Sequence, residues 1–385
     1  MNKIKDQIAV FIPALLIFVI LNSCAKHDEP IKQALFPKAY KVQIDEMISE
    51  TLESTNVPGV ILGVWIDGVG EYCISEGTSN ITTNDPMETD FHFRVGSVTK
   101  TFTGLAVLML ADEGLIDLDE PVQTYLPDKN IPRGDEITVR MLGDMTSGLY
   151  SYTYDSIFGA EFLNNPDKVW YPDSLLALAF RNENLFDPGT DFFYCNTNTI
   201  ILGLLVEKIS NKTIPDFLKE KILMPLELAN TYWPHGSFIP PSYAHGYTVQ
   251  TIDGHMADAT YWNPSWAFTA GQLISTIKDL RTHIESLAKG GLISEEMLRE
   301  QQQWIVIPNK GKYGFGISNK NGWLGHIGSI PGYNTAMYRH EAAGVTIVIN
   351  VNSDIHQQTE PYPVVVFAQR LVAIVASDYP LISSH

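Results

Sequence analysis

The chain has 385 residues, enough for one large domain or two modest ones. Hydrophobic residues make up 45% and charged residues 18%, a composition that excludes intrinsic disorder and predicts a packed core. The 44 acidic and 26 basic side chains give a formal net charge of −18. Such a field repels phosphate backbones, so we expect no nucleic-acid partner.

The N-terminus is typical of a secretory signal. Two lysines precede an apolar stretch over 8–21, which is shorter than the roughly 20 residues of a membrane span. The stretch ends in LNSC at Cys24, which resembles a bacterial lipobox. The resemblance implies a signal peptide over 1–23, a lipid on Cys24, a tether over 24–36 and a mature protein anchored to the cell envelope, periplasmic or associated with the outer membrane. An ordinary signal peptide or an uncleaved anchor is the alternative.

The remaining residues, 37–385, alternate between helical and strand-like patterns. Apolar spacing, turn residues and Pro-Gly breaks predict, in chain order, a helix over 40–53, strands over 60–66 and 72–75, helices over 97–113, 173–181, 198–210, 214–222 and 279–289, strands over 322–330, 333–340 and 344–351, and a helix over 363–376. We therefore predict an α+β fold. Strands from both ends form one antiparallel sheet flanked by helices, and a mostly helical subdomain, roughly 98–275, is inserted and meets the sheet at a cleft.

The cysteines do not form a disulfide framework. Apart from Cys24 there are Cys73 and Cys195, which either form a single bridge or remain two separate buried thiols. The histidines are scattered, and no Cys or His pairs have zinc spacing. We expect no metal and no other cofactor.

The first candidate for chemistry is Ser97 with Lys100, at the start of a long apolar helix. Residues three apart on a helix are neighbours, so the amine can reach the hydroxyl. A desolvated lysine loses affinity for its proton and can serve as a base. The spacing alone is weak evidence, because it recurs at Ser275 and Ser286. At those two places helix capping and an exposed helix face explain it equally well.

Two later segments strengthen the assignment. Tyr194-Cys195-Asn196 lies about a hundred residues downstream, and Gly325-His326-Ile327-Gly328-Ser329 lies on a strand-like run. With these three motifs in this order, the chain resembles the serine β-lactamase and penicillin-binding protein superfamily. The resemblance covers roughly 37–376 and is closest to class C β-lactamases and D-alanyl-D-alanine carboxypeptidases of that type.

The resemblance implies a role for each matching residue. Ser97 is the acylated nucleophile, Lys100 its base, and Tyr194 a proton carrier as phenol or phenolate. Asn196 holds the substrate amide, and His326 lines the strand edge and tunes the local charge. The resemblance implies three further substrate contacts, at Gly328, Ser329 and Trp266. The backbone N–H of Ser329 completes an oxyanion hole with the N–H of Ser97. For Trp266, ordinary packing is an equal alternative.

The implied activity is a serine hydrolase acting through an acyl-enzyme on D-Ala-D-Ala-type cell-wall peptides or β-lactams. Two departures weaken recognition of a substrate carboxylate: Ile327 replaces the usual Thr, and Ile317 and Ser318 stand where some carboxypeptidases carry an Arg. A carboxylesterase on the same fold is therefore an alternative. A non-catalytic lipoprotein that binds cell-wall peptide is a second one.

Overall fold

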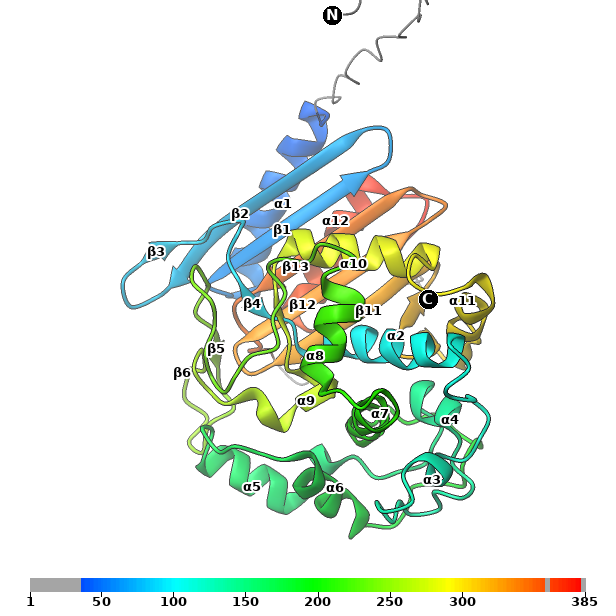
Figure 1. Ribbon diagram of the computed structural model, residues 1–385. Coiled ribbons are helices and arrows are strands. Elements are labelled where there is room, and N and C mark those ends of the chain that lie inside the picture. The colour runs from blue at the N-terminus through cyan, green and yellow to red at the C-terminus, as the bar shows by residue number, and fades with distance from the viewer. Residues whose placement is uncertain (1–35, 357–360, 382–385) are drawn as a thin grey trace, which may run out of the picture. The chain divides into compact units, whose positions relative to one another are not determined.

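The computed structural model describes residues 36–356 and 361–381, which build an antiparallel sheet with helices on both faces (Figure 1). Within these residues the sheet has nine strands in the order β3-β2-β1-β13-β12-β11-β10-β9-β8. Their bounds are β1 Gly59–Ile66, β2 Gly70–Asn80, β3 Asp85–Pro86, β8 Ile305–Ile307, β9 Gly311–Tyr313, β10 Ser318–Lys320, β11 Trp323–Ile330, β12 Tyr333–His340 and β13 Val345–Val351. Two small ladders pair β4 Phe93–Arg94 with β7 Ile274–Ser275, and β5 Tyr247–Thr248 with β6 Ala257–Asp258.

The centre of the sheet joins segments from opposite ends of the sequence. β1 pairs with β13 from Val60 opposite Val351 to Ile66 opposite Val345, and β2 lies on its other side. The predicted α+β class is confirmed. β2 continues to Asn80, five residues beyond the predicted strand, because its backbone pairs with β1 as far as Gly77 and then with β3 at Thr78 and Asn80.

Twelve α-helices are described: α1 Lys38–Thr55, α2 Thr99–Asp112, α3 Val122–Tyr125, α4 Val139–Gly143, α5 Ser156–Asn164, α6 Pro172–Phe180, α7 Asn196–Ser210, α8 Ile214–Leu218, α9 Phe268–Gly271, α10 Ile277–Lys289, α11 Glu295–Gln301 and α12 Pro363–Val375. α1 and α12 cover one face of the sheet and enclose a cluster with Ile44, Leu62, Ile349 and Phe367. α10 lies on the other face, beside the helical subdomain (Figure 1).

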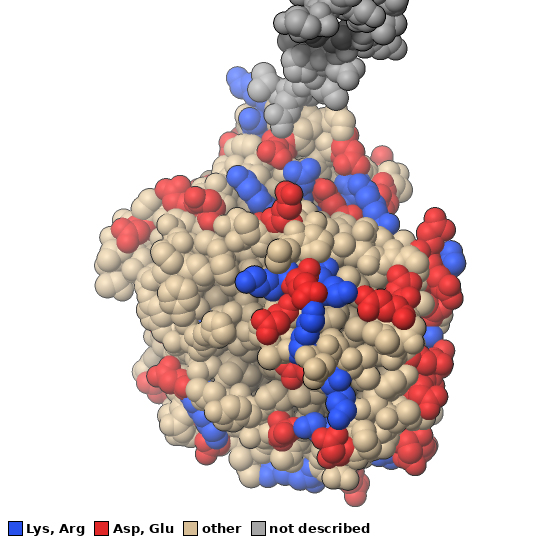
Figure 2. Space-filling view, in the orientation of Figure 1, with Lys and Arg blue, Asp and Glu red and all other residues tan. Residues whose placement is uncertain are grey.

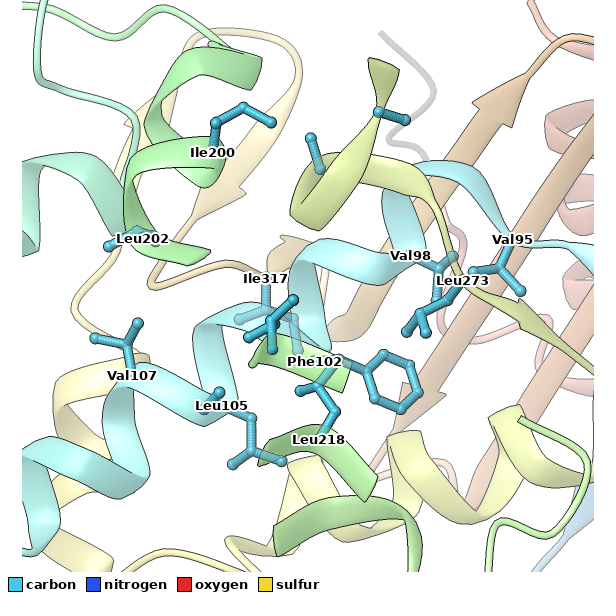
Figure 3. Close-up of a cluster of buried hydrophobic side chains, with 14 of the residues drawn as sticks. Val95, Val98, Phe102, Leu105, Val107, Ile200, Leu202, Leu218, Leu273 and Ile317 are labelled. Atoms are coloured by element: carbon cyan, nitrogen blue, oxygen red, sulfur yellow. The ribbon is translucent and has the colours of Figure 1, made fainter. Parts of the chain in front are cut away.

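α2 is the central helix of the subdomain. Its side chains Phe102, Leu105 and Val107 are buried among residues from α7, α8 and the segment before β7 (Figure 3). The apolar run over 97–113, which predicts a buried helix, is therefore packed against other elements on several sides of the helix.

Two predicted helices contain a turn of another type at one end. The residues predicted to begin the helix at 97 form a 3₁₀ turn, Gly96–Val98, and α2 begins at Thr99. The helix predicted over 214–222 becomes α8 followed by a π turn, Lys219–Leu223. β8, β9 and β10 were not predicted, because three-residue strands are too short to show a periodicity.

On the face drawn in Figure 2, basic side chains lie interspersed with acidic ones. Among the helices of the described ranges, none combines the length and the hydropathy needed to cross a bilayer.

Candidate active site

Ser97 lies in the 3₁₀ turn that precedes α2. Two glycines allow this turn to touch β11 backbone to backbone. Gly96 has φ +53°, and a Cβ atom there would lie 2.8 Å from the backbone nitrogen of Ser329. A Cβ atom on Gly328 would lie 1.8 Å from the carbonyl oxygen of Val95. Any larger residue at either position would push the Ser97 turn away from the strand.

Lys100 lies one turn after Ser97 and is 1% exposed. Its Nζ lies 3.0 Å from Ser97 Oγ and donates a 2.8 Å hydrogen bond to the carbonyl of Ala270. Burial lowers the pKa of Lys100 to about 7, because these two uncharged partners do not compensate for the lost hydration of the ammonium. At neutral pH a large fraction of Lys100 is therefore a free amine that can accept a proton.

Three threonines hold α9, the helix that supplies the Ala270 carbonyl. Thr103 Oγ1 on α2 donates to the carbonyl of Thr269, and Thr269 Oγ1 donates to the carbonyl of Thr199 on α7. Thr99 Oγ1 accepts from the backbone N–H of Leu273. These buried bonds tie α2, α7 and α9 together around the lysine.

Tyr194 reaches the same place from the segment before α7. Its ring centroid lies 4.9 Å from Lys100 Nζ. Its Oη is buried and has no hydrogen-bond partner in the part of the chain that the structure describes. Burial raises the pKa of Tyr194 well above its ordinary value, and the neighbouring Ser97 hydroxyl offsets only part of this effect. The side chain is thus a neutral phenol that approaches both Ser97 and Lys100.

His326 on β11 is buried and uncharged. Its Nδ1 lies 2.6 Å from the carbonyl oxygen of Ile327, so Nδ1 carries the proton and donates it. Nε2 then accepts from the hydroxyl of Tyr313 at 3.0 Å. Burial, followed by the charges of Lys100 and Lys320, lowers the pKa of His326 to about 3. The expectation that His326 tunes local charge therefore needs revision, since the structure makes it a neutral acceptor.

The rings of Tyr194, Tyr313 and His326 pack against one another. The Tyr194 centroid lies 5.9 Å from each of the other two, and those two lie 5.8 Å apart. The Tyr194 ring is thus held by packing, edge-on against Tyr313 and tilted against His326.

The edge of β11 beside Ser97 is open. β10 pairs only with Trp323–Gly325, so the following residues lack a strand on that side. Ile330 and Tyr333 close a two-residue turn, and the next pair is Ser329 opposite Asn334. In an alternating antiparallel ladder the N–H of Ser329 then points away from β12, toward the Ser97 turn. This arrangement suits an oxyanion hole built from the N–H groups of Ser97 and Ser329.

Two of the predicted substrate contacts have other partners. Asn196 begins α7, and its Nδ2 donates to Thr153 Oγ1 at 3.3 Å. The Trp266 ring packs on Phe158 and Phe162, with centroids 5.8 and 5.4 Å away. The structure thus brings together Ser97, Lys100, Tyr194, His326, Gly328 and Ser329, whereas the contacts of Asn196 and Trp266 go elsewhere. Cys24 lies outside the described residues.

The remaining thiols are separate. Cys73 and Cys195 are both free. Cys195 is buried and its Sγ donates to the carbonyl of Leu149, while Cys73 on β2 is half-buried.

No group of three or more His, Cys, Asp or Glu side chains within 36–356 and 361–381 could hold a metal ion.

Sequence reasoning missed two parts of the site. Tyr313 is not part of the three motifs that select the site, and only the fold shows its bond to His326. The Ala270 carbonyl that holds Lys100 is a backbone group, so no residue type could have revealed it. Ile327, which stands where the family usually has a Thr, packs toward the cluster beneath α1 and α12.

This arrangement, a buried lysine beside a serine, a phenol and an open strand edge, is the one that the resemblance to serine β-lactamases and penicillin-binding proteins implies. The family model described as Beta-lactamase matches residues 44–364, and the chain belongs to this family.

Relatives within this fold differ in their named activity. Penicillin-binding protein 4* of Bacillus subtilis (strain 168) is 27% identical over 74% of this chain, and the match spans 65% of that protein's length. A D-stereospecific amidohydrolase from Streptomyces sp. superposes with a TM-score of 0.78, at 30% identity, over 88% of this chain and 98% of the other. A D-amino acid amidase from Ochrobactrum anthropi SV3, solved with L-phenylalanine, gives 0.79 at 25% identity over 88% and 99%.

Proposed function

We propose that the protein hydrolyses amide bonds next to a D-configured acyl group, through an acyl-enzyme on Ser97. The observation that carries this proposal is the buried Lys100 amine, 3.0 Å from Ser97 Oγ, with a pKa of about 7. The chain resembles a D-stereospecific amidohydrolase and a D-amino acid amidase over most of its length, and this likeness supports a D-configured amide as the substrate.

The chemistry follows from the placement of three side chains. Lys100 takes the proton of Ser97 as Oγ bonds to the substrate carbonyl carbon, and the N–H groups of Ser97 and Ser329 bind the oxyanion. When the C–N bond breaks, the leaving nitrogen takes the phenolic proton of Tyr194. The Lys100 ammonium then gives its proton to the Tyr194 oxygen. A water molecule then attacks the ester and its proton passes to Lys100, which gives this proton to Ser97 Oγ as the ester C–O bond breaks.

The site favours a leaving group without a carboxylate. Among the described residues that surround Ser97, His326 is neutral and Lys100 loses its charge near pH 7. Ile327, which replaces the usual Thr, packs toward the opposite face of the sheet. A simple amide or an ester therefore suits the site better than a D-Ala-D-Ala terminus.

D-Ala-D-Ala carboxypeptidase or β-lactamase activity is the second candidate, supported by the likeness to a penicillin-binding protein. Purified protein would be assayed with D-phenylalanine amide, its L-enantiomer, a D-Ala-D-Ala peptide, a short ester and a fluorescent penicillin. Ser97→Ala would serve as the blank. Preferential turnover of the D-amide supports the first proposal, and faster turnover of the peptide or the penicillin supports the second. Faster turnover of the ester supports a carboxylesterase. If folded protein shows neither turnover nor a mass increment on Ser97, it is a binding protein.

We also propose that Cys24 is lipidated and anchors the protein to the cell envelope. The lipobox-like LNSC sequence supports this. Mass spectrometry of membrane-extracted protein should give a lipid increment on Cys24, and Cys24→Ser should move the protein into the soluble fraction. Retention of Cys24→Ser in the membrane without any lipid would contradict the proposal.

A further inference from the structure

His283 on α10 is a buried histidine that the acylation chemistry does not use. It is 0% exposed, and its ring stacks on that of Phe102 on α2, with the centroids 3.5 Å apart. Burial lowers the pKa of His283 to about 3, so the imidazole is neutral at physiological pH. A buried imidazole loses its hydration, whereas an apolar side chain would pack on Phe102 without this cost. The nitrogen atoms of His283 therefore need a reason beyond packing.

The hydrogen bond between His283 and α2 has a definite direction. Thr101 Oγ1 donates its only proton to the carbonyl of Val98 at 2.8 Å. His283 Nε2 lies 2.9 Å from the same hydroxyl oxygen, so Nε2 carries the imidazole proton and donates it. Nδ1 is then an acceptor, and it has no partner among the described residues. Within this part of the chain, the bond to Thr101 is thus the one hydrogen bond that the imidazole makes.

This pair of hydrogen bonds ends at the residue next to the nucleophile. Val98 directly follows Ser97 in the chain. Its N–H donates to the carbonyl of Val95 at 3.3 Å, and its carbonyl accepts from Thr101. Both peptide groups of Val98 are therefore fixed, one by the segment before Ser97 and one by α2. Since Ser97 shares a peptide group with Val98, its own backbone is held with them.

We infer that His283 is a positioning residue for the nucleophile Ser97. α10 packs on β11, β12 and β13, and β11 carries Ser329, whose N–H faces the Ser97 turn. The two hydrogen bonds that link His283 to Val98 thus hold the Ser97 turn at a fixed place relative to β11. This inference rests on the proposed role of Ser97 and adds a residue on a third element to the site.

Thr51 on α1 offers a matched control on the opposite face of the sheet. Its Oγ1 donates to the carbonyl of Met47 at 2.6 Å and accepts from Arg370 Nη1 at 2.7 Å. Thr51 is buried like Thr101 and likewise joins two helices, here α1 and α12. Loss of either hydroxyl should lower Tm, but only Thr101 is linked to the nucleophile.

The test uses a fluorophosphonate, a probe that modifies reactive serines, and follows the mass increment on Ser97 with time. Thr101→Val and His283→Leu should each slow this reaction by about 10–100-fold, because a nucleophile displaced by up to about 1 Å reacts poorly. Thr101→Ser and His283→Gln keep the hydroxyl and a side-chain donor, so they should recover most of the rate. Thr51→Val should react at the rate of the wild type.

Two further measurements separate positioning from a general loosening of the site. The double variant Thr101→Val/His283→Leu should react no more slowly than the slower single variant, since both substitutions break one connection. The fall of the rate on acidification should keep its midpoint near pH 7 in each variant, because Lys100 remains bonded to the carbonyl of Ala270. A midpoint shifted toward the pKa of an ordinary lysine would mean that water has entered the site, and would overturn the positioning role.

The remaining outcomes distinguish this inference from the proposed function. If the probe does not modify Ser97 in the folded wild type, the proposed nucleophile itself fails. If Ser97 reacts in the wild type and equally fast in Thr101→Val, the nucleophile stands and the positioning role of His283 is refuted. Equal slowing in Thr51→Val would also refute it, since lost stability would then explain the effect. If His283→Leu does not fold, Thr101→Val and Thr101→Ser decide.

Discussion

The protonation state of Lys100 gives the most direct test of the catalytic arrangement. An ordinary lysine, with a pKa near 10.4, is only about 0.4% neutral at pH 8. With a pKa of about 7, Lys100 is about 90% neutral at that pH. At pH 5 the neutral fraction falls to about 1%. If the free amine is the base, kcat/KM should fall about 100-fold between pH 8 and pH 5, by one decade per pH unit below 7.

The assay needs a substrate that does not itself titrate in this range. An amino acid amide is unsuitable, because its α-amino group has a pKa near 7.7–8.0. A nitrophenyl acetate avoids this problem. The rate measured with Ser97→Ala at each pH is subtracted to correct for spontaneous hydrolysis. The titration of His326 cannot produce the same fall of kcat/KM below pH 7, since its pKa is lowered to about 3.

Lys320 provides a matched control, because burial also lowers the pKa of this lysine on β10. Lys320→Met should keep the acid limb near pH 7. A profile that stays flat from pH 5 to 9, or a limb that disappears in Lys320→Met, would refute the assignment of Lys100 as the base.

Further predictions concern four residues of the site. Tyr194→Phe should lower kcat by about 10²–10⁴ without lowering Tm, because the phenolic Oη that is removed has no partner among the described residues; a parallel loss of Tm would mean that the effect is structural. Gly96→Ala should lower kcat/KM by at least about 100-fold, since its Cβ would displace the N–H of Ser329; circular dichroism checks the fold, and full activity would exclude that N–H as an oxyanion donor. His326 should stay neutral from pH 5 to 8 in ¹⁵N NMR, and a titration near pH 6.5 would contradict its buried environment. Ser97→Ala should turn over the substrate at least about 10⁴-fold more slowly and should lack the acyl adduct that mass spectrometry finds in the wild type, whereas unchanged turnover would exclude this nucleophile.

The sequence predicted the long elements well because their apolar patterns are long. β12 has the predicted bounds, and β11, α10 and α12 differ from their predictions by one or two residues. Short elements such as β8 to β10 and α9 were missed, since three or four residues cannot show a period of 2 or 3.6. Their positions are set by contacts with distant segments.

The site was predictable where chemistry depends on residue type. Ser97, Lys100 and Tyr194 could be selected, and the structure places them together. The neutrality of His326 could not be predicted, because it depends on burial and on the Tyr313 hydroxyl. The same holds for the contacts of Trp266, since one aromatic residue can line a cleft or fill a core.

The pairing of β1 with β13 has a consequence for biosynthesis. The middle of the sheet cannot assemble until residues near 351 have left the ribosome, because β1 has no neighbour on that side before then. Contacts between such distant segments make folding slow. A nascent chain that remains unfolded for most of its synthesis would suit export across a membrane, and any product truncated before β13 would present an open, aggregation-prone strand.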